Sequence, residues 1–297
     1  MAIWIVAHDA GGSEVLAAWI ATQPYLAITH YILEGPAVSI FKRRNLLQTN
    51  SNRNHLSSIK AADHIYTTTS WQTDLEKIAL KLSNEKKARS HTFLDHWCNY
   101  RKRFMLDGIE YFPDELILAD EYAFEIAKRE IPEVKHRLIP NAYFEEIKND
   151  IVRIKSLTSE LRSGHKILYA CEAILESETP EIPLENSVEY HSLIKYLETI
   201  RGIFINKPVT IRLRKHPAET QRKIDALINL VANDYSGFTF EISCSNSLAQ
   251  DLAWCDELVG MNSMALAVGA ISKIKTTSCI DSSRIKFTLP FDSIIII

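Results

Sequence analysis

The stretch that decides the fold is Ile3-Trp-Ile-Val-Ala-His-Asp-Ala-Gly-Gly-Ser-Glu-Val-Leu-Ala-Ala-Trp-Ile-Ala21. Its apolar, β-branched start at 3–7 predicts a buried strand, and the glycine-containing segment 8–12 predicts a tight turn. Residues 13–21 predict a helix with Ser13 as its N-cap. A strand, a tight turn and a helix in this order form the first βα unit of a Rossmann-like domain.

The same alternation of short β-branched runs and longer amphipathic stretches continues along the chain. It is typical of βα units around a mainly parallel sheet. Further strands are predicted at 27–33, 64–68, 91–94 and 115–118, and in a second series at 166–170, 209–213, 238–242, 257–260 and 275–279. Helices are predicted in the second series at 186–201, 219–232, 247–254 and 263–271.

A polar, helical stretch at 143–164 separates the two series. With 297 residues, the chain has about twice the commonest domain length. We therefore expect an α/β protein of two Rossmann-like domains, 1–150 and 151–297. Open α/β sheets bind ligands outside the carboxyl ends of their strands, so two such domains facing each other predict a central cleft.

The composition favours an ordinary globular protein of the cytoplasm. A net charge of −3, from 34 basic and 37 acidic residues, gives no overall field to hold a nucleic acid. The five cysteines contain no CxxC pair, which argues against a disulfide framework or a zinc site and fits a reducing cytosol. The N-terminus lacks a basic leader, and no apolar run approaches the roughly 20 residues that span a bilayer. Peripheral attachment at the inner membrane stays open.

Two segments of the second series place polar side chains at strand ends. The segment Thr210-Ile-Arg-Leu-Arg-Lys-His-Pro217 runs from a strand into a basic cluster before a helix, and such a helix start with an imidazole suits a phosphate. The alternative is that His216-Pro217 only ends the strand. The segment 256–266 has the form strand, turn and helix, with Ser263 near the helix start. Ser263 therefore either holds the same anion or is a plain N-cap.

Together these segments resemble bacterial inverting GT-B glycosyltransferases of the sialyltransferase and polysialyltransferase type, and related capsule or surface-polysaccharide enzymes. In that family a His-Pro motif and a Ser motif of the C-terminal domain bind the phosphate and ribose of a CMP-sugar. The matching positions are His216-Pro217 and Ser263, with Asn262 beside it. The resemblance implies a nucleotide-binding set of Arg212, Lys215, His216, Pro217, Asn262, Ser263 and Met264, with Glu172 at the ribose or base.

The family's catalytic base usually belongs to a motif of two carboxylates followed by glycine, and this sequence departs from that motif. It offers Asp9, after the first strand, and Asp95-His96, after a later one. Either carboxylate can take the proton of an acceptor hydroxyl. Acceptor or sugar contacts are expected from Gly11, Gly12, Asn99 and Arg103. The alternatives are that Asp9 caps the first helix and that Asp95 lies in a polar packing loop.

The leading hypothesis is an inverting glycosyltransferase that moves a sugar, such as a nonulosonic acid from a CMP-sugar, to a glycan or glycolipid acceptor. A UDP-sugar hydrolase or epimerase is one alternative, and a non-catalytic GT-B-like binding component of a polysaccharide assembly is another. No metal or cofactor is expected, because the histidines His8, His91 and His96 lack metal-ligand spacing. The apolar run 294–297 must be covered, either by its own domain or in a homodimer.

Overall fold

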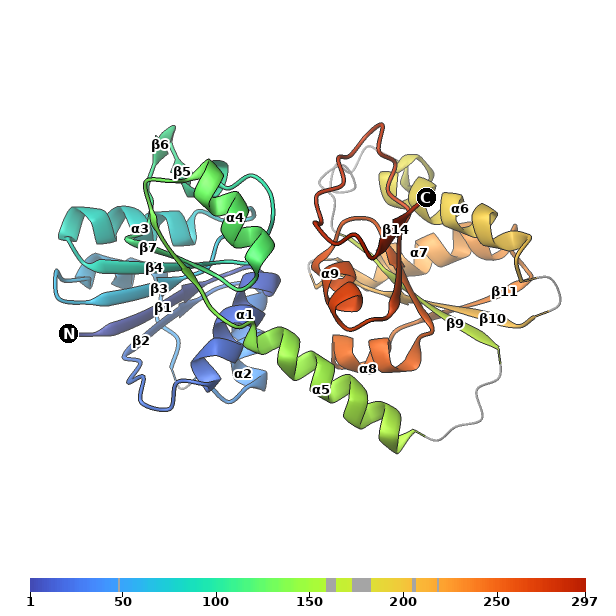
Figure 1. Cartoon of the computed structure of the whole chain (residues 1–297), viewed down its shortest axis with the longest axis horizontal. Helices are drawn as coiled ribbons and strands as arrows, with labels where there is room; N and C mark the ends of the chain where they lie inside the picture. Colours follow the sequence, from blue (N-terminus) through green and yellow to red (C-terminus); the bar gives the residue numbers. More distant parts are fainter. Residues whose placement is uncertain (48, 159–163, 173–182, 205–206, 218) are drawn as a thin grey trace. The chain divides into compact units, whose positions relative to one another are not determined.

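A computed structural model describes residues 1–297 except 48, 159–163, 173–182, 205–206 and 218 (Figure 1). The chain divides into two compact units, Met1–Tyr143 and Phe144–Ile297. The expected boundary after residue 150 lies inside helix α5 (Ala142–Leu157). The observed division, between Tyr143 and Phe144, falls near the start of that helix. The part of the expected polar helical stretch at 159–163 lies outside the described residues.

The first unit is a Rossmann-like domain with a six-stranded parallel sheet in the order β2-β1-β3-β4-β7-β8. Its elements, in chain order, are β1 (Ile3–Ala7), α1 (Ala10–Ala21), β2 (His30–Leu33), α2 (Pro36–Arg43), η1 (Arg53–Ser58), β3 (His64–Thr67), α3 (Leu75–Lys86), β4 (Arg89–Leu94), η2 (Arg101–Phe104), β5 (Met105–Leu106), β6 (Ile109–Glu110), β7 (Glu115–Leu118), α4 (Glu121–Glu130) and β8 (Lys135–Leu138). Strands β5 and β6 form a separate antiparallel hairpin.

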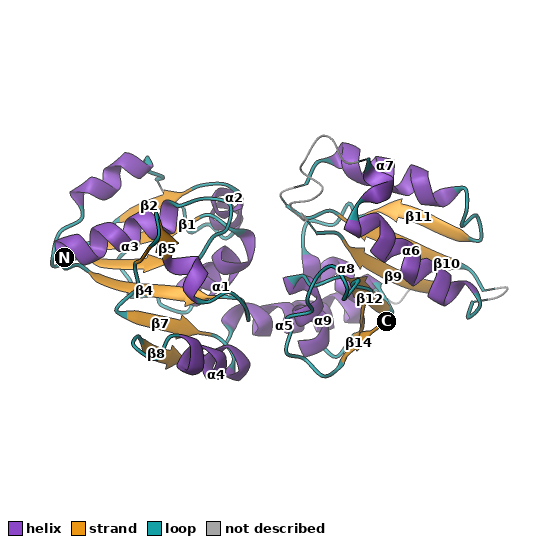
Figure 2. Cartoon of the chain, turned by 90° about the horizontal axis from the view of Figure 1, so that it is seen from above, coloured by secondary structure: helices purple, strands orange, loops and turns teal. Residues whose placement is uncertain are grey.

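The second unit is also Rossmann-like, with a six-stranded parallel sheet in the order β11-β10-β9-β12-β13-β14. Its elements after α5 are β9 (His165–Ala170), η4 (Leu184–Asn186), α6 (Val188–Arg201), β10 (Val209–Arg214), α7 (Gln221–Ala232), β11 (Phe238–Ile242), α8 (Leu248–Trp254), β12 (Glu257–Gly260), α9 (Met264–Ile271), β13 (Lys275–Ser278) and β14 (Ile294–Ile296). Figure 2 shows the helices of this unit on both faces of its sheet.

The core of the first unit follows from the alternation of side chains along β1. Ile5 and Ala7 belong to a buried cluster with residues of α1 and α2. Trp4 and Val6 belong to a second cluster that contains Leu75 of α3. Successive side chains of a strand point to opposite faces, so a strand that is apolar at every position must be covered on both faces. The continuous apolar run at 3–7 therefore defines a central strand.

The predicted strands are confirmed, with small differences at their ends, but the start of the first helix is wrong. Helix α1 begins at Ala10, and Asp9 rather than Ser13 occupies the N-cap position. The Asp9 carboxylate makes no capping bond. Ser13 is instead fully buried within the helix. Gly11 and Gly12 lie inside the helix rather than in a turn, and a Cβ atom at position 12 would collide with Thr68.

Two edge strands were not recognised from the sequence. Strand β8 has the sequence Lys-His-Arg-Leu and is mostly exposed. It therefore lacks the apolar signal of a buried strand, as is common at sheet edges. The closing isoleucine run forms the edge strand β14, which pairs with β13 and buries Ile294 in the second unit. Its own sheet thus provides a partner for this run, and the homodimer expected as the other solution stays a prediction.

Helix α9 packs against its sheet so closely that only glycine fits at position 269. A Cβ atom there would lie 2.4 Å from Leu258 Cδ2 and 2.8 Å from Thr276 Oγ1. We expect Gly269→Ala to lower the free energy of unfolding by about 1–3 kcal/mol, because overpacking outweighs the better helix propensity of alanine. Urea denaturation followed by circular dichroism measures this. Gly202→Ala is the control, since nothing lies within 4 Å of a Cβ there, and an equal loss in both variants contradicts the prediction.

Candidate functional site

The topology marks one position in each sheet where a ligand is expected. In the first unit the strand order reverses at β1, with β2 on one side and β3 on the other. In the second unit it reverses at β9, with β10 and β12 as its neighbours. Loops that leave the two strands at such a reversal run to opposite faces of the sheet and open a crevice at its carboxyl edge. The segments after β1 and β3, and those after β9 and β12, are therefore the candidate sites.

Asp9 is the centre of the polar network at the first reversal. Its Oδ1 atom lies 2.7 Å from Nδ1 of His8 and accepts a hydrogen bond of 2.7 Å from the Ser70 hydroxyl. Its Oδ2 atom accepts a 3.2 Å bond from the backbone N–H of Trp71. The carboxylate thus ties the loop after β1 to the loop after β3. Both of its oxygens already have donors within the unit.

Glu76, which the sequence analysis missed, lies buried beneath this network. Its Oε1 atom accepts hydrogen bonds from the backbone N–H of His8, at 2.8 Å, and from the Thr68 hydroxyl, at 3.1 Å. Its Oε2 atom is buried without a partner among the described residues. Burial raises the pKa of Glu76 to about 8, and the negative charge of Asp9 adds to the rise. Glu76 therefore carries a proton at neutral pH.

Asp95 and His96 follow β4, the neighbour of β3, and lie half-buried at the same edge. Burial raises the pKa of Asp95 to about 6, while the positive charge of Arg103 opposes the rise. Burial and the same arginine lower the pKa of His96 to about 3, so this imidazole is neutral near pH 7. Asp95 is thus a carboxylate poised to change its charge close to neutral pH.

Arg103 joins the loops after β3 and β4 from a buried position. Its Nη1 donates to the Thr69 hydroxyl at 3.1 Å, and its Nε donates to the Cys98 carbonyl at 3.2 Å. The residue is only 3% exposed. Asn99, expected beside it as an acceptor contact, is exposed in a left-handed conformation, with a φ of 57°. Arg103 is therefore the buried cation of this edge, and Asn99 shapes the turn that carries it.

Glu172 connects the two strand ends at the reversal of the second unit. It follows β9, and its Oε1 atom accepts hydrogen bonds from the backbone N–H groups of Met261 and Asn262, after β12. Burial raises its pKa to about 7. The expectation that Glu172 contacts a ribose is untested, but its carboxylate already holds the segment that leads into α9. An anion at this helix cannot use those two N–H groups while Glu172 accepts from them.

The start of α9 contains three of the predicted nucleotide-binding residues, and their contacts differ: Asn262, Ser263 and Met264. Ser263 occupies the N-cap position without a capping bond, and its buried Oγ atom has no partner among the described residues. Asn262 accepts hydrogen bonds from Thr288 and donates to the Lys286 carbonyl. Met264 is the first helical residue. The plain N-cap alternative for Ser263 therefore lacks the bond that defines it among the described residues.

The His-Pro segment lies on the other side of β9, at the end of β10. Lys215 donates through Nζ to the Glu219 carbonyl, and the backbone N–H of His216 donates to the Glu219 carboxylate. His216 is half-buried and Pro217 is exposed. The loop is thus closed on itself through Glu219. The structure brings His216 and Ser263 to the carboxyl edge of one sheet, on opposite sides of β9.

Arg212 lies away from this edge, contrary to its expected role with the phosphate. Its guanidinium pairs with Glu241 at 2.6 Å and with Asp251 at 3.4 Å. It also stacks on the Trp254 ring, with 3.6 Å to the ring centroid. Position 212 lies inside β10, and its side chain emerges on the sheet face that packs toward α8. Arg212 therefore anchors a helix, and its guanidinium is engaged away from the segments expected to bind the phosphate.

Three buried groups at the second edge have donor atoms in metal-binding proximity. Among the residues that the structure describes, Cys171, Glu189 and Glu219 offer ligand atoms within 4.8 Å of one another. Lys223 lies among them, at 2.6 Å from Glu189 and in a short contact with Glu219. Burial and the charge of Glu219 raise the pKa of Glu189. The lysine ammonium thus supplies the positive charge that these two carboxylates share.

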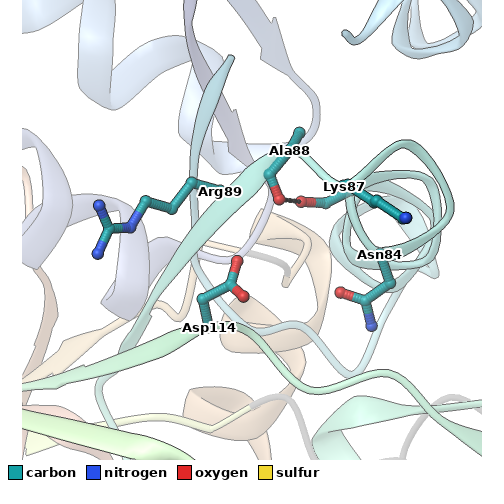
Figure 3. Close-up of a pocket in the computed structure, with 6 residues that line it drawn as sticks. Asn84, Lys87, Ala88, Arg89 and Asp114 are labelled. Atoms are coloured by element: carbon teal, nitrogen blue, oxygen red, sulfur yellow. Dashed lines mark hydrogen bonds between the residues drawn. The ribbon is translucent and has the colours of Figure 1, made fainter. Parts of the chain in front are cut away.

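A pocket of about 410 Å³ lies at the opposite, amino edge of the first sheet (Figure 3). It is lined by Ser83, Asn84, Lys87, Ala88, Arg89 and Asp114. Asp114 is already bound there, because its Oδ2 accepts hydrogen bonds from the backbone and hydroxyl of Ser90. Neither candidate site borders this pocket. Among the described helices, none combines the length and apolar character that crossing a bilayer requires.

The chain is similar over nearly its whole length to several solved structures, two of which are named with a UDP-sugar. A UDP-GlcNAc 2-epimerase from Methanocaldococcus jannaschii matches with a TM-score of 0.66 at 13% identity, over 100% of this chain and 89% of that one. Anabaena Alr3699/HepE in complex with UDP-glucose matches at 0.56 and 10%, over 94% and 80%. The wall teichoic acid polymerase TagF matches at 0.50 and 14%, over 93% and 70%. No protein-family model and no curated protein sequence matches the chain.

These similarities confirm the expected fold class, two Rossmann-like domains of the GT-B type. At such low identity they establish the fold alone. The sugar nucleotides that these structures name carry UDP. The narrower resemblance to sialyltransferases, and with it the CMP-sugar, gains no support from them.

Glu76 gives the first site a measurable dependence on pH. Its pKa rises from an ordinary 4.5 to about 8 on folding. The folded protein therefore holds a proton that the unfolded chain releases, and stability falls as pH increases between these two values. We expect Glu76→Gln to remove this fall, so that the variant gains on the wild type between about pH 5 and about pH 8 in urea denaturation. Glu85 is an exposed carboxylate of the same helix, and Glu85→Gln should keep the fall in stability with pH. If the unfolding free energies of the wild type and of Glu76→Gln change in parallel with pH, Glu76 does not cause the fall.

Proposed function

We propose that this chain is a glycosyltransferase that takes a sugar from a nucleotide-activated donor and transfers it to a glycan or glycolipid acceptor. The observation that carries the proposal is the start of α9, where the Ser263 hydroxyl, at a helix N-terminus, is buried and has no partner in the part of the chain that the structure describes. A helix start with such a hydroxyl suits a phosphate oxygen. The similar structures, which include one with UDP-glucose bound, support a nucleotide sugar as its source.

UDP is the nucleotide that we place first. It is the nucleotide named for the epimerase and for the complex with UDP-glucose. A CMP-linked nonulosonic acid is the alternative donor, and it rests on the His216-Pro217 and Ser263 motifs alone. A UDP-sugar has a diphosphate and a CMP-sugar a single phosphate. Direct binding of the two nucleotides therefore decides between the donors.

Asp95 is the better of the two candidates for the catalytic base. Asp9 accepts hydrogen bonds on both oxygens, so its carboxylate is already engaged in holding the loops after β1 and β3 together. Asp95 has a pKa of about 6, raised by burial. A general base works best when its pKa lies near the working pH, because it is then ionised and still strong enough to accept a proton. Asp9 would instead hold the loop that faces the acceptor.

In the proposed reaction Asp95 takes the proton of an acceptor hydroxyl while that oxygen attacks the anomeric carbon from the side opposite the phosphate. The bond from the anomeric carbon to the phosphate oxygen breaks, and the negative charge moves to the phosphate. Ser263 and the first-turn N–H groups of α9 would stabilise that charge, with His216 as a further donor.

Nucleotide binding is the first test. A nucleotide at 100 times its dissociation constant should stabilise the folded protein by about 2.7 kcal/mol, visible as a thermal shift. In a screen of UDP, CMP, CDP and GDP we expect the largest shift with UDP. Ser263→Ala should weaken binding about 10- to 100-fold, because a hydrogen bond to a charged group is worth about 1.5–3 kcal/mol.

The matched control for this variant is Ser247→Ala. Ser247 forms a complete capping box at the start of α8, so its loss should cost about 1 kcal/mol of stability and leave nucleotide affinity unchanged. No shift with any nucleotide removes the proposed function. Product analysis with and without a glycan acceptor then separates transfer from hydrolysis or epimerisation of the same donor.

Asp95 gives the reaction a defined pH dependence. The base must be ionised, so kcat/KM should fall below about pH 6, where Asp95 becomes protonated. Asp95→Asn should lower kcat about 10²- to 10⁴-fold and leave the KM of the donor unchanged. Asp107→Asn, an exposed aspartate in the β5–β6 turn, is the control. Transfer at the wild-type rate by Asp95→Asn excludes Asp95 as the base.

A further inference from the structure

Trp71 presents an exposed aromatic surface at the first candidate site. The residue follows β3 and is 48% exposed, although large aromatic side chains are usually covered. Its backbone N–H donates to Oδ2 of Asp9, which fixes the loop relative to the end of β1. The ring is thus held at the edge of the site by the same carboxylate network that organises it.

Arg103 supports this ring from below. Its guanidinium carbon lies 5.0 Å from the centroid of the Trp71 ring, within the range of a cation–π contact. The guanidinium is itself fixed to Thr69 and to the Cys98 carbonyl. A buried cation that is held by two hydrogen bonds and contacts the indole restricts the motion of the ring. Little side-chain entropy would therefore be lost when a ligand stacks on its exposed surface.

Hydrogen-bonding groups belong to the segments next to Trp71 at this sheet edge. The Ser70 hydroxyl donates to Asp9, which also accepts from the Trp71 backbone, and the Asp95 carboxylate, after the next strand, feels the charge of the Arg103 that contacts the ring. A pyranose has a flat face of C–H groups and a rim of hydroxyls that donate to carboxylates. An aromatic surface beside two carboxylates matches both features. A flat apolar ligand without hydroxyls would bring no hydrogen-bond donors to these carboxylates.

We propose that Trp71 is a specificity-determining residue on which a pyranose ring of the acceptor stacks, with its hydroxyls directed toward Asp9 and Asp95. This inference rests on the proposed function and assigns the acceptor to the carbohydrates. Trp71 then makes the site prefer a sugar to water as the acceptor, because water gains no stacking energy from the aromatic surface. The hydrogen bond from the backbone N–H of residue 71 to Asp9 does not involve the side chain, so phenylalanine or alanine at this position keeps it.

The test uses the full chain and three saccharide probes, methyl β-glucopyranoside, methyl β-galactopyranoside and chitobiose. At least one probe should change the tryptophan fluorescence of the wild type in a saturable way, and Trp71→Phe should abolish that signal. Calorimetry should then show binding by Trp71→Phe near the wild-type level and by Trp71→Ala about tenfold weaker or worse, as for a truncated aromatic anchor.

Tyr25→Ala is the matched control. Tyr25 is 97% exposed and lies between the end of α1 and the start of β2, at the amino edge of the same sheet. It should leave saccharide binding unchanged. Any of three results overturns the inference. They are binding of uridine but of no saccharide at Trp71, equal saccharide affinity in Trp71→Ala and the wild type, and binding of none of the three probes.

The experiment distinguishes a failure of this inference from a failure of the proposed function, because saccharide binding is measured without nucleotide. Saccharide binding that depends on Trp71, together with no thermal shift from any nucleotide, would leave the carbohydrate site standing and remove the glycosyltransferase. Nucleotide binding without any saccharide binding would do the reverse. In an active preparation, Trp71→Ala should raise the acceptor KM and spare the hydrolysis of the donor by water.

Discussion

The hydrogen-bonded parallel ladder of each sheet is the constraint on which the rest of this structure depends. A parallel strand must be entered from a crossover, so every strand ends at the same edge and every following loop gathers there. The order of strands reverses at β1 in one unit and at β9 in the other. Those reversals separate neighbouring loops and bring together residues such as Asp9 and Ser70, or Glu172 and Asn262, that are distant in sequence.

A second constraint is the shortage of positive charge at these edges. In the second unit the Lys223 ammonium serves both Glu189 and Glu219. In the first unit Arg103 lies near Asp95, and Glu76 has only neutral hydrogen-bond donors. Carboxylates buried with too few cations hold their protons to a higher pH. This explains why groups that titrate near neutral pH occur at both reversals, as is common where proteins do chemistry.

The fold could be read from the sequence because its signals are local. Five apolar residues in a row before a glycine-containing turn define a central strand, whatever lies elsewhere in the chain. Strand β8 was missed for the same reason, since Lys135–Leu138 has no apolar pattern. The predicted start of the first helix was too late, because the glycines at 11 and 12 have the pattern of a turn, whereas Gly12 packs inside the helix against Thr68, in the segment after β3.

The sequence by itself determined two parallel sheets and placed Asp9, Asp95, His216 and Ser263 directly after strands, because the period of side chains along a segment records how that segment is buried. Only the tertiary structure decided which of these groups have partners. It placed Arg212 against Asp251 and Trp254 and buried Glu76 against His8, and within the described residues it gave the Ser263 hydroxyl no hydrogen bond. The charge and partner of a side chain are set by neighbours in space, and His8 and Glu76 are 68 positions apart in the chain.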